Sequence, residues 1–215
     1  METKHNQIEA VENKTEHELI KEQIKRVTVF GPTSKPDEEL SVLLKNIGNK
    51  FSELGLTLIM GADKGALESV SSGVVENDGK VIVVKSTAGR DKGFKTENIP
   101  GHLRGVYYED GHSGKHIGLY ERSGAYMILP GSSLGTYAEL VDTLDKVTNF
   151  DHYLNEAPMP VIFVGDFWKK HYDEFLEPMI KSKGLTEHIY FIKDETEVEP
   201  ILLKYAKLKQ EHEQK

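Results

Sequence analysis

Residues 126–140, YMILPGSSLGTYAEL, combine an anion-binding pattern with a single carboxylate. Two glycines allow the backbone to turn sharply and to approach a ligand closely, and two serines and a threonine add hydroxyl groups. A helix that begins here would also direct its first unpaired amides and its positive dipole end toward the same point. The pattern predicts a phosphate cradle, although an ordinary strand-to-helix turn with a serine or threonine cap has the same composition. The predicted cradle residues are Gly131, Ser132, Ser133, Leu134, Gly135 and Thr136.

The carboxylate of this stretch is Glu139, which lies three residues after Thr136. On a helix, this spacing would project the carboxylate from the first turn toward the same crevice as the cradle. A glutamate in a first helical turn is also favoured by the helix dipole alone. Beside a bound sugar phosphate, a carboxylate can stabilise an oxocarbenium-like transition state or orient a water molecule. The spacing leaves both interpretations open.

Seven short apolar runs, separated by segments of helical character, are expected to position this site. Because the runs carry almost no charge, each is expected to be a strand that is buried on both faces of a parallel sheet. The predicted fold class is α/β, a Rossmann-like doubly wound, mainly parallel sheet of about seven strands flanked by helices. The predicted strands are 26–31, 56–61, 80–84, 105–109, 125–130, 160–165 and 189–193. The predicted helices are 37–54, 65–77, 113–122, 135–149, 167–182 and 195–208.

The loops that follow three of these strands are the expected binding region. In such a sheet, ligands bind beyond the carboxyl ends of the strands, near the point where the strand order reverses. The loops at that edge that contain glycine are VFGPTS, IMGADKGA and LPGSSLGT. We therefore expect one site built from these three loops.

Length and charge exclude several function classes. The 215 residues suffice for one well-buried domain, predicted over residues 26–208 between a charged N-terminal tail or helix (1–25) and a C-terminal tail (209–215). A net charge of −8 and a pI near 5.6 argue against bulk binding to nucleic acid or to anionic membranes. The absence of cysteine excludes disulfides, thiol catalysis and zinc held by cysteine. No apolar run approaches membrane-spanning length, so a cytoplasmic location is expected.

The nine histidines do not predict a metal site. His112 and His116 have the i, i+4 spacing of a metal-binding pair on a predicted helix, but no supporting carboxylate is evident. No HExxH motif occurs either. We therefore expect neither a metal nor an organic cofactor.

The segment LPGSSLGTYAEL resembles the PGGxGTxxE signature of the LOG family, the cytokinin riboside 5′-monophosphate phosphoribohydrolases that were long labelled possible lysine decarboxylases. Other segments resemble further parts of that family in the same order along the chain. VTVFGPTS resembles its first strand and serine-containing loop, GLTLIMGADKGALES resembles its GGGxxGLM segment, and MPVIFVGDFWKKHYDEFLEPM resembles its C-terminal strand and helix. The resemblance extends over roughly residues 26–205. It implies a Rossmann-like superfamily that also contains nucleotide-binding proteins and molybdenum-cofactor carriers.

The resemblance implies a role for each matching residue. Glu139 would be the catalytic carboxylate, and the amides and hydroxyls of residues 131–136 would hold a 5′-phosphate. Lys115 stands where the family has a catalytic arginine and would supply compensating positive charge. The residues implied to border the nucleotide are Gly31, Ser34, Gly61, Asp63 and Lys64. From the residues alone, Ser34 also fits an ordinary turn between prolines, and the Asp-Lys pair fits a solvated loop.

Two departures from the family signature leave three interpretations of the function open. Ser132 replaces the second glycine in a loop that is one residue longer, and Lys115 lacks the planar fork of arginine. The first function is that of a hydrolase similar to nucleoside 5′-monophosphate phosphoribohydrolases, which cleaves the N-glycosidic bond to give free base and ribose 5-phosphate. The alternative is a non-catalytic binder or carrier of a nucleotide-like or phosphorylated ligand, such as an ADP-ribose-type signal or a molybdenum-cofactor-like molecule. A third interpretation is a regulatory interaction protein that binds no ligand.

The expected partners follow from these functions. The ligand is a nucleoside monophosphate or a related phosphorylated small molecule, and neither nucleic acid nor a membrane is expected. The resemblance further implies a homodimer, with helices beside the site forming the interface.

Overall fold

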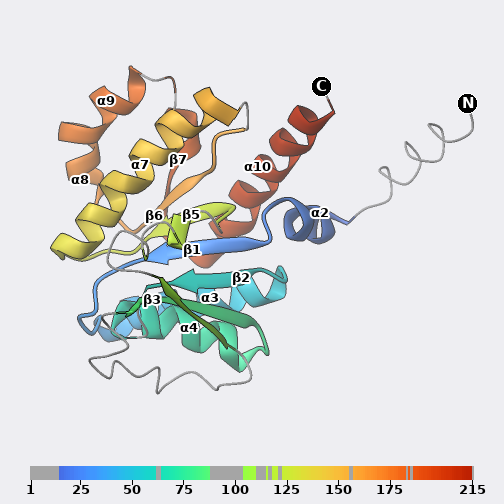
Figure 1. Cartoon of the computed structure of the whole chain (residues 1–215). Coiled ribbons are helices and arrows are strands. Elements are labelled where there is room, and N and C mark those ends of the chain that lie inside the picture. Colours follow the sequence, from blue (N-terminus) through green and yellow to red (C-terminus); the bar gives the residue numbers. More distant parts are fainter. Residues whose placement is uncertain are drawn as a thin grey trace, which may run out of the picture.

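A parallel β-sheet forms the centre of the protein (Figure 1). The structure is a computed structural model that describes residues 15–61, 64–87, 104–109, 115, 118–120, 123–154, 157–182, 184 and 186–214. Within these residues the sheet has seven strands in the order β4-β3-β2-β1-β5-β6-β7, and every neighbouring pair is parallel. The strands are β1 (Arg26–Phe30), β2 (Thr57–Met60), β3 (Lys80–Ser86), β4 (Arg104–Glu109), β5 (Ala125–Ile128), β6 (Val161–Val164) and β7 (Ile189–Ile192). The predicted Rossmann-like α/β fold class is confirmed.

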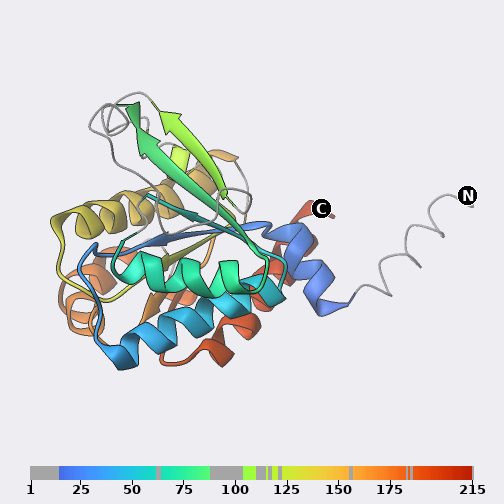
Figure 2. The same ribbon diagram turned by 90° about the horizontal axis from the view of Figure 1, so that it is seen from below.

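Helices cover both faces of the sheet. Figure 2 shows α3 and α4 on one side of the sheet and α7 on the other. The helices are α2 (Glu16–Gln23), α3 (Glu38–Glu53), α4 (Ala66–Glu76), α7 (Leu134–Leu154), α8 (Lys169–His171), α9 (Glu177–Lys181) and α10 (Val198–Glu213). Shorter helical turns are η2 (Tyr172–Leu176), η3 (Thr186–His188) and η4 (Glu195–Glu197). The central strands β1, β2, β5 and β6 are therefore almost fully buried, as their apolar sequences require.

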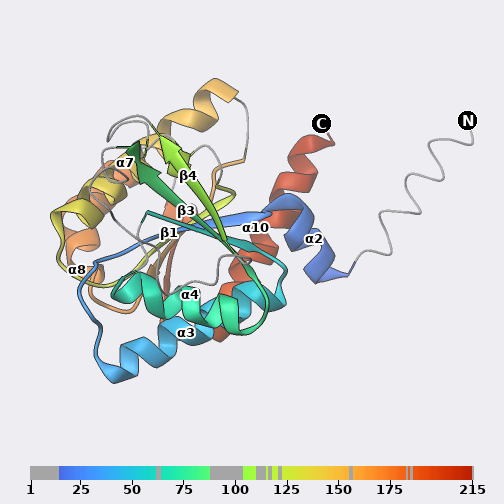
Figure 3. The ribbon, with the colours of Figure 1, turned by 60° about the horizontal axis from the view of Figure 1, so that its bottom comes forward.

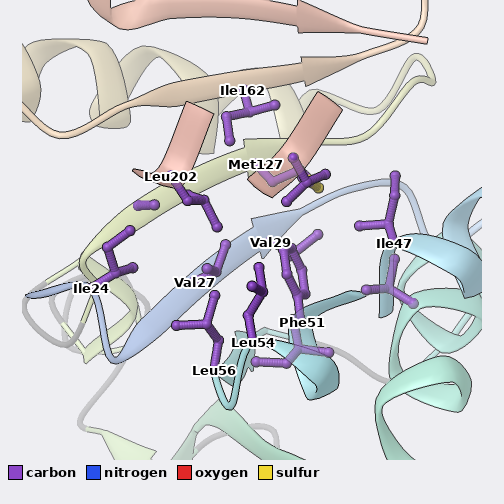
Figure 4. Packing of buried hydrophobic residues seen from close by; sticks show 14 of the residues in the cluster. Ile24, Val27, Val29, Ile47, Phe51, Leu54, Leu56, Met127, Ile162 and Leu202 are labelled. Carbon is purple, nitrogen blue, oxygen red and sulfur yellow. The ribbon is translucent and has the colours of Figure 1, made fainter. Parts of the chain in front are cut away.

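Alternate residues of each central strand enter two separate hydrophobic cores. In β1, Val27 and Val29 belong to the core beneath α3, α4 and α10, where they pack with Phe51 and Leu202 (Figure 4). Phe30, on the opposite face, belongs to the second core with residues of α7 and of the α8–α9 region. Both cores are needed to bury a strand that has apolar side chains on both faces.

The predicted helix 167–182 is divided into α8, the π-helical turn η2, and α9. A proline at position 178 has no amide hydrogen to donate to residue 174, so the regular hydrogen-bond ladder is interrupted there. The amide of Glu177 instead donates to the carbonyl of Tyr172, five residues earlier. The widened turn is the structural consequence of that missing donor.

The last helix, α10, extends to Glu213, past the predicted end at residue 208. It lies beside α2, as Figures 1 and 3 show. Near its end, the Lys209 ammonium donates to the Gln23 carbonyl at 3.1 Å, and the Gln23 amide donates to the Glu213 carboxylate at 3.2 Å. Contacts with a helix from the other end of the chain therefore stabilise turns whose own sequence is polar.

Among the described residues, no helix combines the length and the apolar character that crossing a bilayer requires.

Candidate functional site

The pocket that the sequence led us to expect lies at the carboxyl edge of the sheet. The strand order reverses between β1 and β5, because the chain adds β2, β3 and β4 on one side of β1 and β5, β6 and β7 on the other. A pocket of about 220 Å³ opens there, between the loops that follow β1, β2 and β5. Its described lining residues are Val29, Gly31, Thr33, Gly61, Leu67, Lys115, Ser133, Gly135, Thr136 and Glu139. This position agrees with the general rule for ligand sites in doubly wound sheets.

The N-terminus of α7 forms one wall of the pocket. The hydroxyl of Ser133 accepts a hydrogen bond from the Thr136 amide at 3.0 Å and shares another with the Thr136 hydroxyl at 2.8 Å. Ser133 is thus the N-cap of the helix, which is the ordinary role that the sequence left open. This cap occupies the Thr136 amide. The amides of Leu134 and Gly135, in the first turn, have no carbonyl partner within the helix. The helix end therefore retains donors and positive dipole character for an anion.

The loop after β1 is held between the loop after β5 and the start of α4. Gly131 has φ +137°, and a Cβ atom added to it would lie 2.5 Å from Cγ of Pro32. Gly65 has φ +61°, and an added Cβ would lie 2.3 Å from the Ser34 carbonyl oxygen. Both glycines therefore permit backbone approaches that any other residue would prevent. The walls of the pocket are fixed before a ligand arrives.

Trp168 anchors the strand end from which the cradle loop departs. Its indole Nε1 donates to the carbonyl of Leu129 at 2.9 Å, and the side chain is only 2% exposed. The ring also packs near Tyr137 and Phe167, with centroid separations of 6.2 and 5.1 Å. Trp168 is buried and is not a lining residue of the pocket. Its contribution to the site is therefore to hold the strand end that precedes the loop.

Lys115 and Glu139 face each other inside the pocket. The Lys115 Nζ atom lies 3.8 Å from Oε1 of Glu139, and their side chains are 20% and 13% exposed. This separation is an ion-pair contact rather than a hydrogen bond. The missing side chain of Gly61 makes room for the lysine, since an added Cβ would lie 2.7 Å from Cε of Lys115. A cation and a carboxylate are thus available to the same small ligand.

The structure brings some predicted site residues to the pocket and leaves others outside it. Predicted residues that line it are Gly31, Gly61, Lys115, Ser133, Gly135, Thr136 and Glu139. Predicted residues that are described but are not among the lining residues are Ser34, Lys64, Gly131, Ser132 and Leu134. Leu134 points to solvent with 91% exposure, and Asp63 lies outside the described residues. The histidines 112 and 116 and part of the predicted helix 113–122 also lie outside them.

Three lining residues were not predicted. Val29, Thr33 and Leu67 contribute two apolar side chains and one hydroxyl. Thr33 directly precedes the predicted Ser34, so the glycine-proline turn was a signal for it. Val29 and Leu67 have no chemical signal in the sequence, because their position depends on how β1 and α4 pack.

The arrangement can bind a phosphate and hold a polar group next to it. Lys115 and the α7 amides favour a negative charge, whereas Glu139 disfavours a second one and can accept hydrogen bonds from hydroxyl groups. Within the described ranges, no group of three or more histidine or acidic side chains is placed to hold a metal ion.

Comparisons with known proteins agree with the fold. No protein-family model and no curated protein sequence matches the chain. The molybdenum cofactor binding protein from the phototrophic bacterium Rippkaea orientalis matches in structure with a TM-score of 0.60 and 15% identity, over 85% of this chain and 96% of that one. The Chlamydomonas rheinhardtii Moco carrier protein matches with a TM-score of 0.56 and 17% identity, over 84% and 96% of the two chains.

A third match has a different ligand. DNA processing protein A from Helicobacter pylori, described for its single-stranded DNA binding, matches with a TM-score of 0.53 and 11% identity, over 87% of this chain and 83% of that one. At these identities the likenesses establish the Rossmann-like fold alone. Because the fold is shared by proteins with different ligands, the function must be argued from the pocket. The LOG family resemblance stays a prediction.

Replacing Gly65 by alanine tests the interlocked loops. We expect Gly65→Ala to lower the free energy of unfolding by at least about 2 kcal/mol, because the residue has positive φ and its Cβ would overlap the Ser34 carbonyl. Urea denaturation followed by the fluorescence of Trp168, the one tryptophan, measures this change.

Gly135→Ala is the matched control for folding. Gly135 lies in the first turn of α7, and an added Cβ would meet only the Ser133 hydroxyl oxygen, at 3.8 Å. We expect this variant to be as stable as the original protein or up to about 1 kcal/mol more stable. Equal stability of the two variants would contradict the tight packing of the loop after β1.

Proposed function

We propose that this protein binds or carries a phosphorylated, nucleotide-like small molecule in the pocket between β1 and β5. The observation that carries the proposal is the convergence of the Lys115 ammonium, the N-terminus of α7 and the Ser133 and Thr136 hydroxyls on one preformed cavity. Two proteins of similar fold bind or carry the molybdenum cofactor, which supports a small-molecule ligand. A nucleoside monophosphate, an ADP-ribose-type signal and a molybdenum-cofactor-like molecule are the ligands of this class that we infer.

The charge distribution favours a phosphate ester over free phosphate. Lys115 offers a point charge for the phosphate, and α7 adds its dipole. Glu139 lies 3.8 Å from the lysine and would repel a second anionic group there. A ligand that joins one phosphate to a hydroxyl-bearing group, such as a ribose, satisfies both sides of the pocket. This combination is the reason for proposing a nucleotide-like molecule.

Titration with AMP, ADP-ribose and inorganic phosphate tests the binding function. We expect Lys115→Met to weaken binding of the best nucleotide by roughly 10- to 100-fold, because a charge-assisted hydrogen bond contributes about 1.5–3 kcal/mol. Isothermal titration calorimetry measures the dissociation constants.

Lys45→Met is the matched control. Lys45 is an exposed lysine of α3 that pairs with Glu76 at 2.7 Å, and it is not a lining residue of the pocket. Its replacement is expected to leave nucleotide binding within twofold. Binding that survives Lys115→Met unchanged, or the absence of binding to all three compounds, would contradict the proposed function.

A second candidate function is hydrolysis of a nucleoside monophosphate, and the position of Glu139 favours it. In that reaction the bond between C1′ and the base nitrogen breaks, water adds its oxygen to C1′, and a proton goes to the departing base. The half-buried carboxylate would stabilise the cationic sugar or orient the water, with Lys115 holding the phosphate. No cofactor is needed for this chemistry.

Chromatography of nucleotide incubations separates the two functions. If the protein is a binder, we expect no free base from AMP, GMP, CMP or UMP, and equal nucleotide recovery with Glu139→Gln. Base release that Glu139→Gln abolishes would show hydrolysis instead. The variant removes the charge and keeps the shape, so a loss of activity would report on the carboxylate.

We further propose that the protein forms a homodimer through the outer face of α7, in agreement with the family resemblance. Leu134, Tyr137 and Val141 are 91%, 40% and 46% exposed and occur at helical spacing. Phe167 is 42% exposed and packs against Trp168, which also packs near Tyr137. An exposed apolar surface of this kind is typical of a protein interface.

Sedimentation velocity tests this interface. We expect the protein to sediment as a dimer and Val141→Lys to sediment as a monomer, because a lysine on each copy would introduce unpaired charges into the contact. Val42→Lys is the control, since Val42 is 56% exposed on α3, a helix on the other face of the sheet. A monomeric original protein would contradict the proposed interface.

A further inference from the structure

Leu119 and Tyr120 are two buried helical residues that follow Lys115 in the chain, and side chains from other elements hold their carbonyls. The Tyr120 carbonyl accepts hydrogen bonds from the Lys146 ammonium at 2.6 Å and from the Tyr126 hydroxyl at 3.2 Å. The Leu119 carbonyl accepts one from the Thr28 hydroxyl at 3.0 Å. These donors come from α7, β5 and β1. Three separate elements therefore fix these two buried carbonyls.

The side chain of Tyr120 contacts α7 through its hydroxyl group. Its hydroxyl lies 3.2 Å from the Glu139 carbonyl oxygen and 3.4 Å from Oδ2 of Asp142. The residue is 8% exposed, and its ring packs against Phe30 at a centroid separation of 5.7 Å. Burial, reinforced by the Asp142 and Glu139 carboxylates, raises the pKa of the Tyr120 hydroxyl. The hydroxyl therefore stays protonated and can donate a hydrogen bond to α7.

Tyr120 lies near both residues of the pocket's ion pair, one along the chain and one through a hydrogen bond. Lys115 precedes it by five residues in the chain, and the hydroxyl contacts the backbone of Glu139 itself. The Glu139 carbonyl also accepts from the Thr143 hydroxyl at 2.7 Å, so this turn of α7 is held from within as well. A change in how Tyr120 sits against α7 is therefore expected to change the separation of Lys115 and Glu139.

We propose that Tyr120 is a positioning residue that sets the distance between Lys115 and Glu139 and thereby the affinity of the pocket for a phosphorylated ligand. The effect on affinity rests on the proposed function, whereas the effect on the ion pair does not. Tyr120 itself does not line the pocket. Its role differs from that of a buried tyrosine that only stabilises the fold, because removing the hydroxyl acts on the ligand through Lys115.

A double-mutant cycle measures this coupling. The variants are Tyr120→Phe, Lys115→Met and the double variant, with AMP as the titrated probe. We expect Tyr120→Phe to weaken AMP binding by roughly 3- to 10-fold when Lys115 is present and by less than twofold when it is replaced. An equal loss in both backgrounds, or no loss in either, would overturn the proposal.

Tyr205→Phe is the matched control. The Tyr205 hydroxyl donates to the Ala157 carbonyl at 3.2 Å, and the residue is 4% exposed in the other hydrophobic core. Both substitutions remove one buried hydroxyl from a tyrosine that donates to a carbonyl, so both should cost similar stability. We expect only Tyr120→Phe to change AMP binding. An equal effect of the control would show a merely structural role for Tyr120.

A second readout needs no ligand. Reductive ¹³C-methylation labels the lysine amines, and the resonance missing from Lys115→Arg identifies Lys115. We expect Glu139→Gln and Tyr120→Phe to shift this resonance in the same direction, and Tyr205→Phe to leave it in place. If the protein binds no AMP, the proposed function fails, while this resonance still decides the positioning role. An unmoved resonance in Tyr120→Phe would overturn it.

Discussion

The close approach of three backbone segments at the carboxyl edge of the sheet is the constraint on which the site depends. Gly131 against Pro32, and Gly65 against the Ser34 carbonyl, leave no space for a Cβ atom. Because these contacts involve backbone and a proline ring, the loops cannot relax around a larger residue as flexible side chains can. This packing determines the shape of the pocket. A preformed pocket lowers the entropy cost of binding, because its loops need not be ordered when a ligand binds.

Electrostatics at the pocket differ from those of the whole chain. The chain has a formal net charge of −8, yet the cavity presents one lysine, one glutamate and the positive end of a 21-residue helix. For the proposed ligand, attraction over long distances would therefore be weak, and recognition would depend on contacts made within the cavity. Such a site favours selectivity for the shape of the ligand over rapid capture of any anion.

Sequence reasoning predicted the sheet, which the structure confirms, and the start of the helix beside the pocket, because both depend on short-range patterns. Runs with almost no charge predicted the strands, and the spacing of Ser133, Thr136 and Glu139 placed three side chains on one face of the first two turns of a predicted helix. The hydrogen bonds of Trp168 to Leu129 and of Tyr120 to α7 could not be predicted in this way, since each joins residues that only the folded chain brings together. Leu134 was predicted to belong to the cradle, but its side chain is exposed to solvent. A loop motif does not reveal which of its side chains point away from the pocket.

The pairing of α2 with α10 sets an order on folding during synthesis. His17 contacts Glu199 across a sequence separation of 182 residues, and Gln23 contacts Glu213 across 190. Ile24 and Leu202 lie in the hydrophobic core that also contains Val27 and Val29 of β1 (Figure 4). A ribosome makes α2 well before α10, so the helix that precedes the central strand lacks this partner until synthesis has passed α10. The part of the core around β1 that α10 covers therefore stays open until α10 is made, and its closing is a long-range step in folding.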